Sequence, residues 1–138
     1  MNELEKIINT AWENKDQVNP DSDKNLKDAI NQIIEDLDSG KVRVAEKINN
    51  EWITHQHIKK AIMLSFKTHG MEILTGPYSA WHDKAHLLKG KTAGWTKKDF
   101  EKAGFRMVPN TPVRKGSYIA KNVVLMPCFI NIGAYIGS

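Results

Sequence analysis

The sequence predicts an α+β fold, in which a helical N-terminal domain with a β-hairpin is followed by the first coil of a parallel β-helix. Three patterns predict this fold. Apolar residues recur at helical spacing over the first 40 residues. Two short alternating runs flank Asn49-Asn50, as in a hairpin. From Tyr118 onward, apolar residues recur every six positions, which is the period of a β-helix and fits neither an α-helix nor a lone strand.

The composition is that of a folded protein without a strong bias toward one kind of partner. Hydrophobic residues make up 41% and charged residues 26% of the 138 residues, which argues against disorder. The net charge of +4 is too small to indicate nucleic-acid binding and suits an anionic small substrate equally well. No apolar run approaches the roughly 20 residues that span a membrane, and the N-terminus lacks a secretory signal. With the single Cys128, these features predict a cytoplasmic protein that binds neither nucleic acid nor membrane.

Two antiparallel helices are predicted before residue 40. Asn19-Pro20-Asp21 separates them, because proline disfavours helix in the residue before it. Asp21 or Ser22 can cap the second helix, and Ser39-Gly40 ends it. The apolar face of the first helix consists of Leu4, Ile7, Ile8, Ala11 and Trp12, and that of the second of Leu26, Ala29, Ile30, Ile33, Ile34 and Leu37.

The middle of the chain predicts a hairpin and a third helix. The hairpin strands are expected at Val42–Val44 and Trp52–Thr54, and the helix from His55 to Thr68. Between Met71 and Trp95 the pattern weakens: Met71–Leu74 is a candidate strand, and the remainder is interpreted as a loop.

A short helix and an extended connector precede the six-residue repeat. Thr96 to Asp99 resembles a capping box, and the helix that it begins stops at Gly104. Two prolines near residue 110 then predict an extended segment. We therefore expect two domains, a helical domain with a hairpin at 1–108 and the start of a β-helix at 109–138.

The repeat region covers about one coil. One solenoid coil cannot bury its interior alone, since about three repeat units are the minimum, so we expect a truncated structure. Cys128 lies at a small-residue position and is interpreted as a buried filler rather than a nucleophile. The large residues of the repeat are Tyr118, Val124, Ile130 and Ile136, and the small ones are Asn122, Cys128 and Ala134.

Histidines and lysines of the third helix give little support to a metal or nucleic-acid site. His55 and His57 are two positions apart and so point in different directions on a helix, and no Cys, Asp or Glu completes a zinc spacing. We expect no metal site. Lys59, Lys60 and Lys67 make this helix basic, for which a solvated face is the simplest interpretation.

Arg106 is the candidate binding residue. It follows the helix-ending Gly104 and the aromatic Phe105, so a fixed loop would project it. A guanidinium pairs with a carboxylate through two parallel hydrogen bonds, which lysine cannot copy. From the residues alone, an exposed surface arginine is the simpler interpretation. The same alternatives apply to Arg114 and Lys115, with the surface interpretation stronger there.

Several motifs fall in order along nearly the whole chain, and together they resemble one enzyme family. They are Asp38–Lys47, Trp52–His55, Lys59–Ala61, Leu64–Phe66, Gly104–Arg106, Val108-Pro109, Val124–Pro127 and Asn131–Tyr135. In this order they resemble tetrahydrodipicolinate N-succinyltransferase. The resemblance implies transfer of succinyl from succinyl-CoA to the amine of L-2-amino-6-oxopimelate, in diaminopimelate and lysine biosynthesis. It also implies a left-handed β-helix and a homotrimer with active sites between subunits.

The resemblance assigns only one site residue within this chain. Arg106 matches the family arginine that binds the dicarboxylate substrate. The family's substrate-contacting aspartate and its CoA-binding coils come after Ser138, so we expect no catalytic or cofactor-binding residue here, no permanently bound cofactor and no activity of the isolated chain. Where the family usually has Asp-Glu, this chain has Gly137-Ser138. The segment 81–95 matches the family poorly, and its role stays open, like that of Arg114.

A non-enzymatic oligomerisation or binding module is the alternative hypothesis. Ile130, Ile132 and Ile136 would leave an apolar rung uncovered, whereas a stand-alone solenoid needs a polar cap. This favours an N-terminal portion of the enzyme. The sequence leaves open whether its early end is natural, whether residues 109–138 are ordered alone and whether the chain trimerises.

Overall fold

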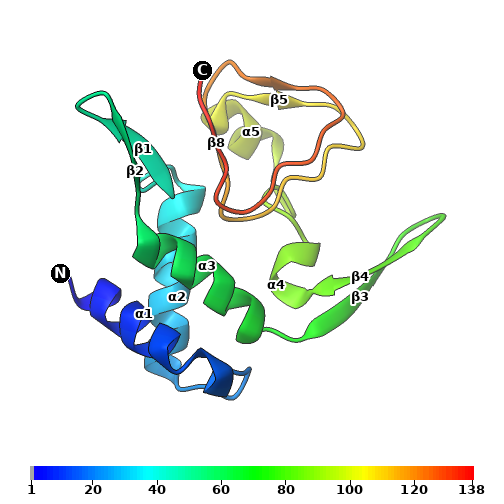
Figure 1. Ribbon diagram of the computed structural model, residues 1–138. Helices are drawn as coiled ribbons and strands as arrows, with labels where there is room; N and C mark the ends of the chain where they lie inside the picture. Colours follow the sequence, from blue (N-terminus) through cyan, green and yellow to red (C-terminus); the bar gives the residue numbers. More distant parts are fainter. Residues whose placement is uncertain (1) are drawn as a thin grey trace.

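Helices α1 and α3 pack against the apolar face of α2. The computed structural model describes residues 2–138 and confirms the α+β class. Its helical bundle consists of α1 (Glu3–Glu13), a 3-10 turn η1 (Lys15–Gln17), α2 (Lys24–Asp38) and α3 (Gln56–Lys67) (Figure 1). All six residues of the predicted α2 stripe are buried. The cap of α2 is neither Asp21 nor Ser22 but Asp23, whose carboxylate accepts the Leu26 N–H at 2.9 Å.

The predicted hairpin is confirmed, with a later first strand. Strands β1 (Ala45–Ile48) and β2 (Glu51–Thr54) are antiparallel. Asn49 and Asn50 both have left-handed backbone, with φ of 49° and 67°, as a two-residue hairpin turn requires. Val42 and Val44 precede the strand because both pack against the helical core.

A second hairpin replaces part of the loop that was expected before Trp95. Strand β3 (Met71–Thr75) pairs with β4 (Ala80–Lys84), and α4 (Ala85–Leu88) follows directly. The candidate strand at Met71–Leu74 is confirmed as β3, whereas the interpretation of residues 80–84 as a loop is wrong, because pairing with β3 imposes a strand on a run in which only Trp81 has high β-propensity. The two hairpins extend from opposite ends of α3 (Figure 1).

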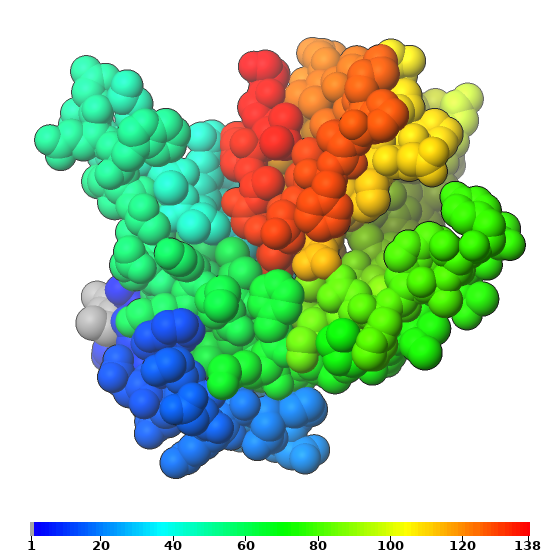
Figure 2. All heavy atoms as spheres, turned by 45° about the vertical axis from the view of Figure 1, so that its right-hand side comes forward, coloured from blue at the N-terminus to red at the C-terminus, as the bar shows by residue number. Residues whose placement is uncertain are grey.

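The C-terminal quarter winds so that one turn stacks on the next. After α5 (Lys97–Ala103) come four two-residue strands: β5 (Arg106–Met107), β6 (Tyr118–Ile119), β7 (Val124–Leu125) and β8 (Tyr135–Ile136). Strand β5 pairs in parallel with β7, 18 positions later, and β6 with β8, 17 positions later. Figure 2 shows this coil, residues 105–138, resting against the helical bundle.

A six-residue period in backbone geometry underlies the coil. Gly104, Asn110, Gly116 and Asn122 all have left-handed backbone, so a corner recurs every six residues. Asparagine tolerates this conformation better than other residues with a β-carbon. The buried side chains form a second core that consists of Phe105, Val113, Ile119, Leu125 and Ile130.

The apolar repeat agrees with the prediction at the buried Ile130 but differs from it by one residue at two earlier positions. Ile119 and Leu125 face inward, one residue after Tyr118 and Val124, because successive side chains of a strand point to opposite sides. Cys128 is exposed, so its interpretation as a buried filler is wrong. The next inward residue after Leu125 is Ile130, five positions on, which leaves the residues between them outside the core.

A polar junction attaches the coil to the helical bundle. One Asp38 carboxylate oxygen accepts the Gly116 N–H at 2.8 Å, and the other lies 2.9 Å from Lys91 Nζ. Lys91 also donates to the Asp38 carbonyl at 2.8 Å and, through its backbone N–H, to the Val113 carbonyl at 2.7 Å. The Lys91 side chain is only 6% exposed. We call Asp38, Lys91 and Gly116 the Asp38 junction.

Further contacts reinforce this attachment on both sides. Arg114 pairs with Asp83 at the end of β4, and Lys115 pairs with Glu35 of α2. These pairs assign structural roles to two cations whose roles the sequence left open. Arg43, before β1, lies over the ring of Tyr135 with its guanidinium carbon 3.5 Å from the ring centroid.

Two stacked histidines lie where β3 and α4 meet α3. The rings of His69 and His86 are 3.9 Å apart at 21°. His86 Nδ1 is buried and has no hydrogen-bond partner within residues 2–138, while Nε2 lies 3.3 Å from the Ser65 hydroxyl. Burial, followed by the nearby charges of His69, Lys84 and Arg114, lowers the pKa of His86 from 6.5 to about 4.

Replacing Asp38 by alanine is expected to destabilise the protein strongly. The change leaves the Lys91 ammonium buried without its carboxylate, and loss of one partner of such a pair costs about 3 kcal/mol. Urea unfolding followed by circular dichroism measures this loss. The matched control is Asp28→Ala, which breaks an exposed pair with Lys24 and is expected to cost about 0.5 kcal/mol or less. Equal losses in the two variants would contradict a structural role of the junction.

The stability of the protein is expected to fall between pH 6.5 and pH 4 because of His86. Its folded-state pKa lies below the ordinary value, so the unfolded chain binds the proton first and acid favours unfolding. Above pH 6.5 this contribution is fully present. Each kcal/mol lost lowers the melting temperature by roughly 3–5 °C. Thermal unfolding at several pH values should give a shallower acid decline for His86→Gln than for the unmodified chain, and parallel curves would refute the assignment.

Candidate functional site

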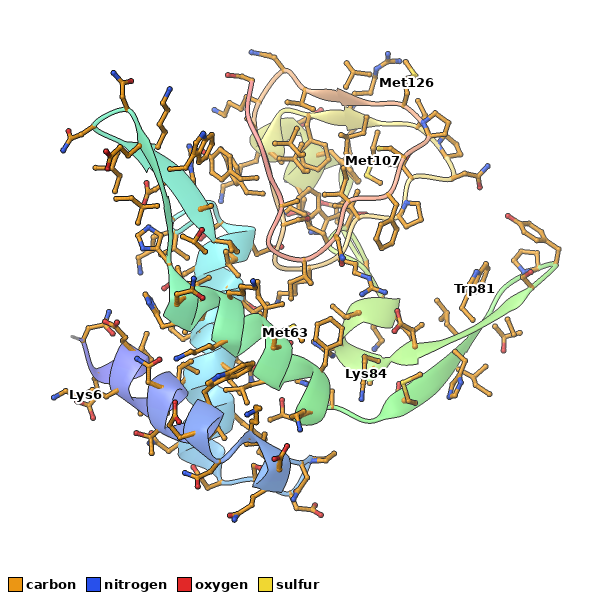
Figure 3. All side chains as sticks on the ribbon, in the orientation of Figure 1. Lys6, Met63, Trp81, Lys84, Met107 and Met126 are labelled. Carbon is orange, nitrogen blue, oxygen red and sulfur yellow. The ribbon has the colours of Figure 1, made fainter. Side chains whose placement is uncertain are left out.

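Arg106 lies on the outward side of the coil, in strand β5. Its side chain is exposed, whereas the residue before it, Phe105, is only 6% exposed. The alternation continues at Met107, which contacts the coil core. In Figure 3, the labelled Met107 lies inside the ring of the coil, whereas Met126 lies at its outer margin. The backbone thus directs the guanidinium away from the core.

The backbone at Arg106 is fixed from both sides. Its N–H donates to the Val123 carbonyl at 2.9 Å, and the Val108 N–H donates to the Leu125 carbonyl at 3.1 Å. Before it, Gly104 closes α5 in the left-handed conformation with φ of 75°, and its carbonyl accepts the Asn122 N–H at 2.7 Å. An arginine on such a support has a fixed Cα position and loses little entropy on binding a ligand.

The helix before Arg106 is itself fixed at both ends. The predicted capping box of α5 is present: the Asp99 carboxylate accepts the backbone N–H and the hydroxyl of Thr96, each at 2.7 Å. These hydrogen bonds, first the one from the hydroxyl, lower the pKa of Asp99 below its ordinary value. Phe105 anchors the other end, because its ring packs 5.8 Å from that of Trp95 and 6.1 Å from that of Phe100.

The guanidinium of Arg106 is free to bind a carboxylate. Within residues 2–138 it takes part in no ion pair, whereas Arg114 is paired with Asp83 and Lys115 with Glu35. Its neighbour across the parallel pair is Val124, which is 47% exposed and carries no charge. An unpaired guanidinium beside an apolar surface can take both oxygens of one carboxylate.

The other candidates of the sequence do not join Arg106. His55 and His57 face different glutamates, with His55 Nε2 2.7 Å from Glu46 and His57 Nδ1 3.9 Å from Glu5. Across residues 2–138 there is no cluster of three or more His, Cys, Asp or Glu side chains with the spacing of a metal site. In the same part of the chain, no helix is both long and apolar enough to cross a bilayer.

Sequence reasoning missed the Asp38 junction, which attaches the coil that carries Arg106 to the helical bundle. Asp38 directly precedes the helix-ending Ser39-Gly40, and this position alone could have suggested a carboxylate at the end of α2. Lys91 lies 53 positions later in a segment without a recognisable pattern, so nothing in the sequence pairs it with Asp38.

Comparison with known proteins identifies one family. Residues 3–68 match the model described as tetrahydrodipicolinate N-succinyltransferase N-terminal. A protein of Pelagibacter ubique (strain HTCC1062), named 2,3,4,5-tetrahydropyridine-2,6-dicarboxylate N-succinyltransferase, is 70% identical over 136 residues, which are 99% of this chain and 50% of that protein. Proteins of the same name from Dechloromonas aromatica (strain RCB) and Haemophilus influenzae (strain PittEE) are 50% and 48% identical, each over 96% of this chain and 48% of their own length.

The chain spans about half the length of the curated relatives it matches. The matched family model covers the helical bundle and the first hairpin, and the relatives extend the similarity through the coil and Arg106. Residues 3–68 therefore match the N-terminal domain of the tetrahydrodipicolinate N-succinyltransferase family, and the chain as a whole resembles an N-terminal portion of such a protein.

Proposed function

We propose that these residues belong to an enzyme that transfers succinyl from succinyl-CoA to the amine of L-2-amino-6-oxopimelate, in diaminopimelate and lysine biosynthesis. Within it, Arg106 binds a carboxylate of the dicarboxylate acceptor. The observation that carries this proposal is an exposed arginine without an ion-pair partner in residues 2–138, held on a fixed strand of a chain that matches proteins of that name.

The role of Arg106 in this reaction is to position the acceptor. A bidentate pair with one carboxylate fixes both the location and the orientation of the acceptor, so that its amine approaches the thioester carbonyl in a reactive geometry. Arginine keeps its charge at every physiological pH, so it does not serve as the base. Arg106 is therefore a binding residue and takes no proton.

The proton acceptor and the acyl-donor site must come from other residues. Attack by the amine requires removal of a proton, for which a carboxylate or a histidine is suited. No Asp, Glu or His follows Glu101 in the sequence, so the coil that carries Arg106 offers none of these groups. We propose that this chain contributes no catalytic residue and no CoA-binding residue, and that the isolated 138 residues do not catalyse the transfer.

The coil, residues 105–138, is proposed to be the start of a left-handed parallel β-helix, and it begins slightly before the domain predicted at 109–138. The parallel pairings at offsets of 17 and 18 residues and the corners at six-residue spacing support this proposal. A homotrimer with the active site between subunits accords with a guanidinium that points away from its own chain. A cytoplasmic location and the absence of a permanently bound cofactor stay predictions of the same proposal.

Replacing Arg106 by glutamine should weaken acceptor binding in a protein that contains these residues and the further length found in the relatives. Hydrogen bonds to a charged group contribute about 1.5–3 kcal/mol, so kcat/KM for the dicarboxylate should fall roughly 10- to 100-fold, mainly through KM. Steady-state assays of CoA release measure both constants. Lys98→Gln, which removes a cation from nearby α5, is the control and should leave kcat/KM unchanged. Equal effects of the two substitutions would exclude a specific carboxylate contact.

The isolated 138-residue chain should release no CoA from succinyl-CoA above the buffer rate in the presence of acceptor. The reason is that the coil supplies a binding cation without a proton acceptor. A thiol-detection assay with the purified chain measures this rate. Acceptor-dependent CoA release that is lost in Arg106→Gln would show that the chain is itself catalytic and would overturn the division of roles.

A further inference from the structure

We propose that a hollow between the end of α2, helix α5 and the coil binds a small anionic ring compound, at a site separate from Arg106. The hollow measures about 440 Å³, which lies within the range of small-molecule sites. Its apolar wall presents the half-buried rings of Trp95 and Tyr118, whereas the neighbouring Phe105 and Ile119 are buried in the core of the coil, and its cationic rim consists of Lys102 and Lys121. Arg106 does not line it.

The aromatic side chains of this wall are locked in place by their neighbours. Trp95 packs against Phe105 and also edge-on against Phe100, with ring centroids 5.1 Å apart in the second pair. Tyr118 lies between Tyr135, at 4.6 Å, and Gly40, where an added β-carbon would be 2.6 Å from the Tyr118 ring. A wall that does not rearrange costs little ordering entropy when a flat ring packs against it.

At the hollow, the carboxylates have hydrogen-bond partners, whereas two lysine ammonium groups have none among residues 2–138. Both carboxylates that border it are already engaged: Asp38 with Gly116 and Lys91, and Asp99 with Thr96. By contrast, none of the ion pairs or side-chain hydrogen bonds among residues 2–138 involves Lys102 or Lys121, while Lys91 is bound to Asp38. Their ammonium groups therefore offer unused donors at the rim.

The two lysines both start close to the C-terminal end of α5. Lys102 is in the last turn of α5, and the stem of Lys121 crosses Gly104, where an added β-carbon would lie 3.0 Å from Lys121 Cγ. Two ammonium groups beside an aromatic wall fit a flat ring that carries one or two carboxylates or a phosphate. The ring would pack on the wall and the anionic groups would accept hydrogen bonds from the lysines.

Isothermal titration of the 138-residue chain with benzene-1,3-dicarboxylate tests the site. We expect saturable binding with a Kd on the order of 0.1–1 mM, while the neutral benzene-1,3-dicarboxamide should not bind. Phenyl phosphate, titrated in parallel, distinguishes a carboxylate from a phosphate preference. The double variant Lys102→Gln with Lys121→Gln should weaken binding at least tenfold, because both charge-assisted donors are lost. Lys98→Gln, on the same helix but outside the hollow, should bind as the unmodified chain does.

Arg106→Gln separates this site from the proposed acceptor site. It should leave in place the binding of benzene-1,3-dicarboxylate that depends on Lys102 and Lys121, whether or not Arg106 functions in succinyl transfer. Loss of binding in Arg106→Gln would assign the anion to Arg106 and overturn the proposal. No saturable binding of either anion, or equal affinity in the double variant, would also overturn it. Because both lysines are exposed, the double variant should stay folded, which circular dichroism verifies.

Discussion

The carboxylate of Asp38 is the contact on which the rest of the arrangement depends. It ends the helix at the centre of the bundle core and binds at once the buried Lys91 ammonium and the Gly116 N–H at a corner of the coil. The coil stacks one turn on the next but falls short of the about three stacked units that a solenoid needs, so it buries few of its own side chains. The position of the coil therefore depends on contacts with the rest of the chain. The ion pairs of Arg114 with Asp83 and of Lys115 with Glu35 provide further contacts of this kind.

This attachment determines which cations are available for binding. The residues after Glu101 include Lys102, Arg106, Arg114, Lys115 and Lys121 and no carboxylate. Carboxylates of the body neutralise Arg114 and Lys115, which then serve structure. Arg106 on the outer wall and the lysines at the rim of the hollow keep their hydrogen-bonding capacity. The proposed anion binding is consistent with the uneven distribution of acids along the chain, and the two proposed sites use different cations of this C-terminal segment.

The sequence predicted the parts of this fold that depend on local pattern. The stripe of α2, the hairpin turn at Asn49-Asn50 and the capping box at Thr96 have short-range causes, and all three are present. Strand β4 could not be predicted, because it exists through pairing with β3. The inward phase of the repeat was missed by one residue at Ile119 and Leu125, since the six-residue period does not say which side of a strand meets the core. Arg106 was recognisable from its motif, whereas the Asp38 junction joins residues that are distant in the sequence.

Amide hydrogen exchange of the unmodified chain, measured by NMR, tests most directly whether the Asp38 junction orders the coil. The amides of Arg106, Tyr118 and Ala120 donate to carbonyls of the next turn of the coil. If the Asp38 junction orders the coil, these amides should be protected, and their protection should fall together with that of Gly116 when Asp38 is replaced by alanine, while the centre of α2 stays protected. Exchange of the coil amides at the rate of an unfolded peptide in the unmodified chain, or protection that is unchanged in the variant, would contradict this account.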